Sequence, residues 1–557
     1  MIARWRLLAL GLIVAALSAC GHVTNDDQRL CAGPSCPGYD PQSGYRFDPG
    51  KAPQRNTLVV VTLSGGGVRA SALAYGTLLA LKDLKGPGGA SLLDDVDIIS
   101  SVSGGSVTAG WYALRGHAGL EDPAGLKQFL YADNMAAMAW RGLNPAALTG
   151  YLVTDYQRSD TLTGYFADRL FKESTYAEVD STYRTTANQP FVILNATDLG
   201  HEIVFPFTQG RFDLLCSDLA RYRLADAVAA SANFPIVFSP IGVRNYSPDC
   251  RAHDATWQAA GPPQWIDSYL RNYDSRNPAG IDEAGHATPI RPSNGLLQLR
   301  AARSASDYVN AGNDDHVVHL LDGGVVDNLG IQSVFAIEDD PICTPGLFQR
   351  LATPRPPAYR RIDHVLFVVV NARSRDPAGI DAEVAPPDIP SSLLRMIDTS
   401  LDSTILSTQN YLTSELQAIA GYGTTADAAT KGYTPRSVSR RGSCWCNTSP
   451  VSSTSPGCVG AGSAQIDRAN VPLQAKIVTV DFEMIPYKPC RDRFWGMSTS
   501  WTLPARDIDD LVTLPRILLS KSPDLKDFYK SFGTRDDMQA EADRLSGAKV
   551  DFTDVCS

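Results

Sequence analysis

The segment Asp97–Ser106 constrains the fold of this chain more than any other. It begins as an apolar, β-branched run and continues as Ser-Val-Ser-Gly-Gly-Ser, where no side chain is large, before the helix-compatible run Val107–Leu114. A strand, a sharp turn with a serine at its tip and a helix form the context that a nucleophile elbow requires. Ser103 is therefore a candidate nucleophile. Ser101 replaces the first glycine of the common Gly-x-Ser-x-Gly pattern, so a plain Ser/Gly-rich loop stays open as the alternative.

A second strand–turn–helix segment carries three consecutive glycines. The apolar run Val59–Leu63 leads into Ser-Gly-Gly-Gly-Val-Arg-Ala, and good helix formers follow over Ala70–Leu84. Glycines at a helix N-terminus leave backbone N–H groups uncovered, and the helix dipole there favours negative charge. The turn therefore predicts a site for a phosphate or a developing oxyanion. It lacks the lysine of a phosphate-binding loop and the glycine spacing of a dinucleotide site.

A third segment places an aspartate at the end of an apolar strand. The run from Val317 to Leu321 is followed by Asp322 and two glycines, which clear space around the carboxylate. Asp327 or Asn328 is interpreted instead as a cap for a following helix over Gln332–Glu338.

Together the three segments resemble the signature of the patatin-like phospholipases, in the same order and at similar spacing. The resemblance implies that Gly65, Gly66 and Gly67 form an oxyanion hole, that Ser103 is the nucleophile and that Asp322 completes a Ser–Asp dyad. It implies a lipid acyl hydrolase of the phospholipase A or lysophospholipase type, acting through an acyl-enzyme without a cofactor.

The resemblance extends over roughly Thr57–Ile337. The segment Ala227–Pro235 is similar to the family's helix-to-proline segment before the last core strands. Ser64 departs from the aspartate that precedes the glycines in plant and bacterial patatins, and the turn is closer to that of mammalian cytosolic phospholipases. Arg69, just beyond the turn, either binds a lipid phosphate or orders the loop, and we favour the second role.

Two other readings remain open. An α/β-hydrolase would use Ser103, Asp322 and His364 in that chain order, although His364 precedes a strand instead of following the last one. A non-catalytic lipid-binding envelope lipoprotein would retain the fold without turnover, but all the family's catalytic positions are filled.

The N-terminus has the pattern of an export signal. Arg4 and Arg6 precede the apolar run Leu7–Leu17, and the sequence Leu-Ser-Ala-Cys follows, ending at Cys20. The run is too short to span a bilayer, for which about 20 residues are needed. The final cysteine resembles a bacterial lipobox, which implies that Cys20 is lipidated. Because Gly21 follows, the outer membrane, facing the periplasm, is the expected location.

Charge and cysteine content agree with export and exclude some partners. Without residues 1–19 the chain has 48 basic and 60 acidic side chains, a net charge of −12, which disfavours nucleic acid as a partner. Attachment to membrane lipid must then come from the acyl anchor. Besides Cys20 there are ten cysteines, an even number that suggests disulfides. Cys444 and Cys446 are expected to pair with Cys458 or Cys490. No spacing favours a metal site.

Apolar strands alternate with helical stretches along most of the chain. This pattern predicts an α/β fold, and the resemblance implies its patatin-like three-layer form, with a mainly parallel central sheet covered by helices on both faces. The predicted strands are Leu58–Leu63, Val96–Ser100, Phe191–Asn195, His316–Leu321, Val365–Val370 and Ile477–Phe482. We expect a lipoprotein signal peptide at 1–19, a tether at 20–56, a patatin-like catalytic core at 57–340 and a C-terminal extension at 341–557, with a Cys/Ser/Gly-rich loop at 434–470.

Two further segments are interpreted by composition. The stretch Tyr112–Arg184 includes Trp140, Leu143 and other apolar residues with little charge among them, typical of an apolar lid or lipid-facing wall, or of a packed helical layer. Residues 243–315 are rich in Asn, Asp, Pro and Gly and are predicted to form a surface loop.

Overall fold

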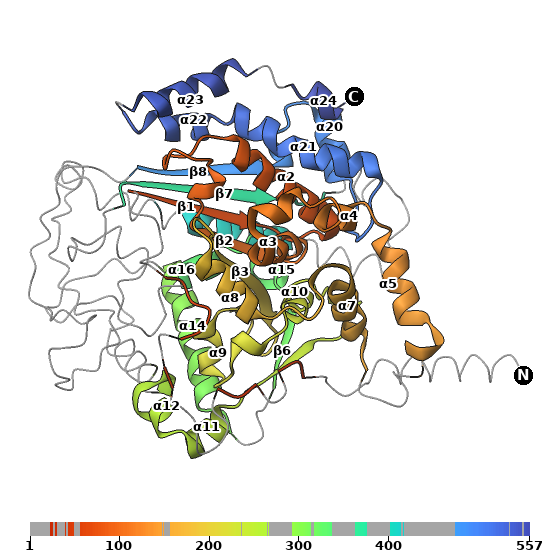
Figure 1. Cartoon of the computed structure of the whole chain (residues 1–557), viewed down its shortest axis with the longest axis vertical. Helices are drawn as coiled ribbons and strands as arrows, with labels where there is room; N and C mark the ends of the chain where they lie inside the picture. The colour runs from red at the N-terminus through yellow and green to blue at the C-terminus, as the bar shows by residue number, and fades with distance from the viewer. Residues whose placement is uncertain are drawn as a thin grey trace, which may run out of the picture.

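In a computed structural model of the chain, the fold is built on an eight-stranded sheet. In Figure 1 its strands run across the view, with helices in front of them. The structure describes residues 23–25, 28–30, 39–40, 43–48, 56–147, 149, 156–235, 237–263, 266, 292–312, 317–336, 362–375, 401–413, 416, 474–533, 535–548 and 551–556.

The strand order is β5-β6-β3-β2-β1-β7-β8, with β4 paired to β3 outside this path. Strands β3, β2, β1, β7 and β8 run parallel, whereas β4 and β6 pair antiparallel with β3, and β5 pairs antiparallel with β6. The strands are β1 Thr57–Leu63, β2 Ile98–Val102, β3 Phe191–Asp198, β4 Ile203–Pro206, β5 Ile241–Arg244, β6 Val317–Asp322, β7 His364–Asn371 and β8 Gln474–Asp481. The mainly parallel sheet of the predicted fold class is confirmed.

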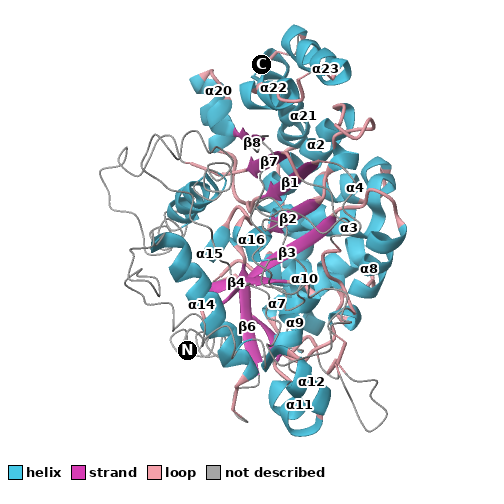
Figure 2. Ribbon diagram, turned by 90° about the vertical axis from the view of Figure 1, so that its left-hand side faces the viewer, coloured by secondary structure: helices cyan, strands magenta, loops and turns pink. Residues whose placement is uncertain are grey.

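Helices cover both faces of the sheet, as Figure 2 shows. The central strands β1, β2 and β3 are buried along their whole length, which explains their unbroken apolar or small-residue sequences. The α-helices are α2 Gly67–Asp83, α3 Gly104–Glu121, α4 Leu126–Leu130, α5 Asn134–Leu143, α7 Arg158–Phe166, α8 Tyr176–Thr185, α9 Gln209–Leu214, α10 Leu224–Ser231, α11 Ser247–His253, α12 Ala255–Ala260, α14 Pro292–Val309, α15 Gly324–Asp327, α16 Gln332–Ala336, α20 Lys488–Trp495, α21 Ala505–Lys521, α22 Pro523–Lys530, α23 Asp536–Gly547 and α24 Thr553–Cys556.

The C-terminal part of the chain packs directly on the core. Strands β7 and β8 continue the sheet beyond β1, and α21 lies against α2. The two helices approach closely at Gly76, where a Cβ atom would lie 2.3 Å from the Val512 carbonyl oxygen. Glycine at this position therefore permits the contact between α2 and α21.

All six predicted strands are present, but two short strands were not predicted. Strands β4 and β5 have four residues each, too few for a period-2 pattern to be recognised. The prediction of a surface loop over residues 243–315 is wrong in the described part. This region includes the end of β5 and the helices α11, α12 and α14, which pack against neighbouring elements despite their polar composition.

The stretch between the elbow and β3 is helical, from the end of α3 through α4, α5 and α7 to α8, with a π-helical turn, η2, over Ala167–Phe171. Most of its apolar residues are buried, in agreement with a packed helical layer, but α5 exposes Trp140 and Leu143. Residues 150–155 lie outside the described part of the chain. Within the described residues, no helix combines the length and apolarity needed to cross a bilayer.

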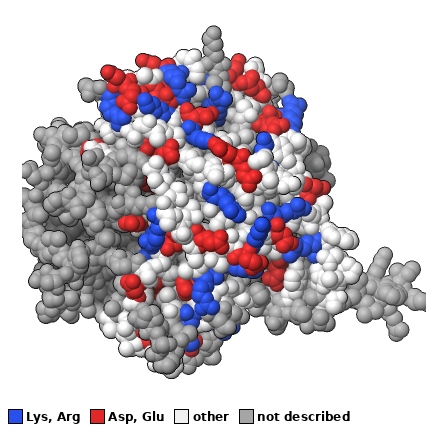
Figure 3. All heavy atoms as spheres, in the orientation of Figure 1, with Lys and Arg blue, Asp and Glu red and all other residues white. Residues whose placement is uncertain are grey.

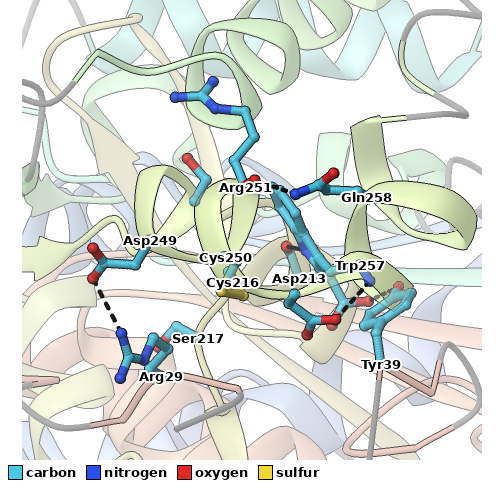
Figure 4. The surroundings of a disulfide bond; sticks show 12 residues. Arg29, Tyr39, Asp213, Cys216, Ser217, Asp249, Cys250, Arg251, Trp257 and Gln258 are labelled. Atoms are coloured by element: carbon cyan, nitrogen blue, oxygen red, sulfur yellow. Dashed lines mark hydrogen bonds and ion pairs between the residues drawn. A yellow bond between two sulfur atoms is a disulfide. The ribbon is translucent and has the colours of Figure 1, made fainter. Parts of the chain in front are cut away.

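In the part of the chain that the structure describes, two disulfides join segments distant in the sequence. Cys216 pairs with Cys250 in α11, and Figure 4 shows the bond beside the ion pair of Arg29 with Asp249. Cys490 in α20 pairs with Cys556 in α24. Cys490 is therefore not the partner of the 444–458 cysteines, a correction to one of the expected pairings. Those three cysteines, with Cys20, Cys31, Cys36 and Cys343, lie outside the described residues.

Candidate active site

Ser103 occupies a strained turn between β2 and α3. Its φ and ψ are 51° and −120°, a conformation that L-residues rarely adopt and that is held only where the surroundings enforce it. The small neighbours have a steric reason. A Cβ at Gly104 would lie 2.0 Å from the Gly67 carbonyl oxygen, and one at Gly105 would lie 2.7 Å from that of Leu63. The elbow and the glycine-rich turn therefore touch through their backbones.

A buried serine holds the strained turn in place. Ser231, the last residue of α10, accepts a hydrogen bond from the Ser103 N–H at 2.9 Å and donates to the Asn195 carbonyl of β3 at 2.6 Å. Ser106 lies 2.8 Å from the Ser231 oxygen and 3.0 Å from that of Ser101. The serine at position 101, in place of the usual glycine, is thus part of a hydrogen-bond network beneath the elbow.

Asp322 ends β6 and lies directly beside the elbow. The Ser103 hydroxyl donates to Asp322 Oδ2 at 2.7 Å, and the Gly324 N–H donates to Oδ1 at 2.8 Å. Burial raises the pKa of the Asp322 carboxyl to about 6, while the hydrogen bonds from Ser103 and Gly324 oppose the rise. The carboxylate is therefore a stronger base than an exposed aspartate and contacts the hydroxyl directly.

The end of α10 connects the two halves of this pair. Besides holding Ser103, Ser231 accepts the Gly323 N–H with its carbonyl at 3.1 Å, and Asn233 accepts the Asp322 N–H at 3.0 Å. One short segment thus fixes the backbones of both Ser103 and Asp322. The sequence showed this segment as similar to a family motif, but no local pattern indicated that Ser231 contacts Ser103.

The glycine-rich turn presents backbone amides next to Ser103. Gly66 and Gly67 have φ values of 137° and 62°, and within the described residues nothing accepts a hydrogen bond from either N–H. Gly65 differs, because its N–H donates to the Asn328 carbonyl at 3.2 Å. The expectation that the Gly65 N–H is an available donor is therefore corrected, and Gly66 and Gly67 remain the candidate donors. Gly65 is needed instead for close approach, since a Cβ there would lie 2.5 Å from Asn328 Oδ1.

Arg69 is buried and ties three loops together. Its Nε donates to the Ala372 carbonyl at 2.8 Å and its Nη2 to Thr499 Oγ1 at 3.1 Å, while Nη1 donates to the Met497 carbonyl. These contacts support the loop-ordering role over the binding of a lipid phosphate. They join the glycine-rich turn to segments after β7 and before α21.

A pocket of about 570 Å³, including its open mouth, lies over these groups at the carboxyl ends of β1, β2 and β7, where ligands of parallel sheets bind. Both apolar and polar residues line it. Its lining comprises Gly65, Gly66, Arg69, Ser103, Phe234, Pro235, Asp322, Val325, Asn328, Ala372, Arg373, Ser374, Leu401, Asp402, Ile405 and Thr499. The sequence did not indicate the lining residues from Ala372 onward, because they come from segments far from the three motifs.

The histidines considered for a triad lie elsewhere. His364 begins β7, at the opposite end of the strand from the pocket, where its ring stacks on Phe532 at 4.0 Å. His319 is exposed on β6 and faces away from the buried Asp322, as the alternation of side chains along a strand predicts. Asp327 caps the turn before α16 by accepting N–H groups from Leu329, Gly330 and Gln332, as expected. Among the described residues, no cluster of His, Cys, Asp and Glu could hold a metal ion.

Residues 61–281 match the family model described as patatin-like phospholipase, a family of lipid hydrolases. The chain carries a patatin-like domain. The match includes the turn glycines and Ser103, whereas Asp322 lies beyond its end. A solved structure similar to this chain is that of human GIVD cytosolic phospholipase A2, with 14% identity and a TM-score of 0.29. The similarity covers 56% of this chain and 45% of that one, so the chain spans less than half of the relative's length. No curated protein matches the chain.

Proposed function

We propose that this protein is a serine-dependent lipid acyl hydrolase of the phospholipase A or lysophospholipase type. One observation carries the proposal: the Ser103 hydroxyl donates to the buried Asp322 carboxylate at 2.7 Å, and both residues line a pocket together with Gly66 of the glycine-rich turn. A nucleophile, a base and an oxyanion site within contact of one another are the groups that acyl transfer needs. The patatin-like domain match supports a lipid ester as the substrate.

In the proposed reaction, Ser103 attacks the ester carbonyl carbon while Asp322 takes the hydroxyl proton. The carbonyl oxygen becomes an oxyanion, which the N–H groups of Gly66 and Gly67 stabilise. Such a donor contributes about 10²–10³ in rate. The tetrahedral species collapses by breaking the bond to the leaving alcohol, which receives the proton from Asp322. The acyl group then remains on Ser103.

Deacylation repeats the same steps with water. Asp322 takes a proton from a water molecule, which attacks the acyl-enzyme carbonyl carbon, and the bond to Ser103 Oγ breaks. The proton passes from Asp322 to Ser103, and the fatty acid is released. The raised pKa of Asp322 matters here, because a base that titrates near 6 is ionised at neutral pH and still a better proton acceptor than an ordinary aspartate.

The alternatives are less well supported by the geometry. A Ser–Asp–His triad would need His364 beside Asp322, but its Nε2 lies 3.3 Å from the Ser531 carbonyl, at the far end of β7. A non-catalytic lipid-binding protein would have no need for the strained φ of Ser103, which positions a nucleophile.

We propose that the substrate lies in a membrane and that the mature protein is an exported lipoprotein anchored through Cys20, most simply in the outer membrane facing the periplasm. The lipobox-like sequence supports the anchor. The disulfides Cys216–Cys250 and Cys490–Cys556 support an oxidising compartment.

A panel of defined lipids tests the proposal. Purified protein is incubated with a diacyl phospholipid, a lysophospholipid, a diacylglycerol and an acyl thioester, and the products are identified by mass spectrometry. Release of a free fatty acid by the parent protein, and its absence with Ser103→Ala, is the expected result. A protein that binds these lipids but releases no fatty acid from any of them is the non-catalytic alternative.

A further inference from the structure

Helix α5 turns an apolar face to solvent. Met135, Trp140 and Leu143 are 47%, 72% and 68% exposed, and the other two exposed positions of the helix are Ala136 and Ala139. At about 100° per residue, these five positions span an arc of about 140°. No charged side chain lies on this arc, which we call the α5 face, and the indole N–H of Trp140 is its only polar side-chain group. Scattered apolar residues are ordinary on a protein surface, whereas a contiguous apolar face marks an interaction site.

The polar residues Asn134 and Arg141 lie on the opposite side of α5 from this face. Asn134 is buried, donates to the Phe129 and Trp501 carbonyls at 3.0 Å and 2.8 Å, and accepts from the Tyr165 hydroxyl at 2.6 Å. Arg141 pairs with Asp168 of the neighbouring turn. These contacts fix the rotation of the helix, so the α5 face cannot be buried by turning the helix on its axis.

The helix is joined to the active site by one short segment. Thr502 accepts the Met135 N–H at 2.9 Å, and the Ser500 carbonyl accepts the N–H of Val68, in the first turn of α2, at 2.9 Å. Thr499 lines the pocket. Residues 499–502 thus link the N-terminus of α5 to the glycine-rich turn and the pocket wall. Figure 1 shows α5 at the side of the molecule toward which the parallel strands point. The pocket residues Gly65 and Ser103 follow the ends of two of these strands, β1 and β2.

We propose that the α5 face inserts into the surface of a lipid bilayer and holds the pocket against it. The choice of lipid as the occupant rests on the proposed function. It agrees with a face made of Trp, Leu, Met and Ala, since Trp and Leu are the side chains with which interfacial helices enter the headgroup region. The face of the protein in Figure 3 mixes acidic and basic groups without a large basic area, and the proposal accordingly assigns the contact to apolar side chains and not to charge.

A position-specific fluorescence measurement tests the insertion without relying on catalysis. An environment-sensitive fluorescent amino acid replaces Trp140 in the full chain carrying Ser103→Ala, mixed with phosphatidylethanolamine–phosphatidylglycerol vesicles. The matched control carries the probe in place of Leu199, which is 49% exposed in the β3–β4 turn. We expect a blue shift and quenching by spin-labelled lipid at position 140 only. Equal responses at both positions, or none at position 140, overturn the proposal.

A second measurement separates docking from the chemistry. In the active chain, the double change Trp140→Ser with Leu143→Ser should lower turnover of vesicle phospholipid at least tenfold, with turnover of a soluble short-chain ester within twofold of the parent. Leu199→Ser should leave both unchanged. Unaltered turnover of vesicle phospholipid by the double variant contradicts the proposal. So does gel filtration in which the parent is a dimer and the double variant a monomer, because the α5 face would then be a contact between two copies of the chain. If the parent protein is inactive on both substrates, the proposed function is refuted. The fluorescence measurement then still tests whether the α5 face binds the bilayer, because it does not depend on catalysis.

Discussion

The Ser103 hydroxyl donates to Asp322 Oδ2 at 2.7 Å, although 219 residues separate the two in the chain. The contact depends on the direction of β6, which runs antiparallel to β3 and places Asp322 opposite Ala196, next to the elbow that follows β2. The described residues that line the pocket include no histidine, and the acceptor of the Ser103 hydroxyl is the Asp322 carboxylate.

The first prediction concerns the base. Asp322→Asn keeps the shape of the side chain but removes its basicity, so kcat should fall by about 10²–10⁴, the usual contribution of a general base. Individual His319→Gln and His364→Gln variants should retain kcat within about tenfold, which is about 1.4 kcal/mol of barrier. Steady-state kinetics on variants with parent-like circular dichroism measure this. A folded histidine variant as inactive as Asp322→Asn would establish the triad instead.

A second prediction concerns pH. Activity needs ionised Asp322, whose pKa burial raises to about 6, so kcat/KM should increase about tenfold per pH unit below 6 and level off above 7. The midpoint should shift little with temperature, because carboxyl ionisation has a small enthalpy, whereas an imidazole midpoint falls on warming. Profiles measured at two temperatures distinguish the groups, and a strongly temperature-dependent midpoint would contradict the assignment.

Ser231 is predicted to be a positioning residue. It accepts the Ser103 N–H and does not line the pocket, so its loss should relax the strained turn without changing substrate contacts. Ser231→Ala should lower kcat by about tenfold or more with KM nearly unchanged, whereas Ser231→Thr, which keeps the hydroxyl, should restore most of the rate. Equal losses in both variants would point to packing alone. Ala232→Ser, one residue along, is a control for local perturbation.

The anchor gives a fourth prediction. If Cys20 is lipidated, cells fed an alkyne-bearing fatty acid should incorporate the label into the parent protein and not into Cys20→Ala. The purified parent should also partition into detergent in phase separation. Labelling that persists in Cys20→Ala would place the modification at another residue and require a different account of attachment.

Short sequence patterns predicted those parts of the fold and the site that are formed by consecutive residues. The elbow and the glycine-rich turn are strand–turn–helix units whose small residues are required by a close backbone approach. Both units can therefore be recognised in the sequence. The partner of Gly65 was not predictable, because Asn328 reaches it only through tertiary packing. The same holds for Ser231 beneath Ser103 and for the pocket residues after β7, since hydrogen bonds between distant segments leave no periodicity in the sequence.

The prediction for the stretch between the elbow and β3 shows a different limit. Composition suggested either a lipid-facing wall or a helical layer, and the structure contains a packed layer from which one helix, α5, exposes an apolar face. Composition alone could not say which apolar residues were buried, because α5 buries Asn134 and exposes Trp140, the reverse of the usual pattern.

The most direct test of the account is covalent labelling of Ser103. A fluorophosphonate probe reacts with an activated serine, so intact-protein and peptide mass spectrometry should find one adduct, on Ser103, in the parent chain. Ser103→Ala should show none, and Asp322→Asn should label far more slowly than the parent at pH 7. Labelling that continues unchanged in Ser103→Ala, or a parent that fails to react while correctly folded, would contradict the assignment of Ser103 and Asp322 as the catalytic pair.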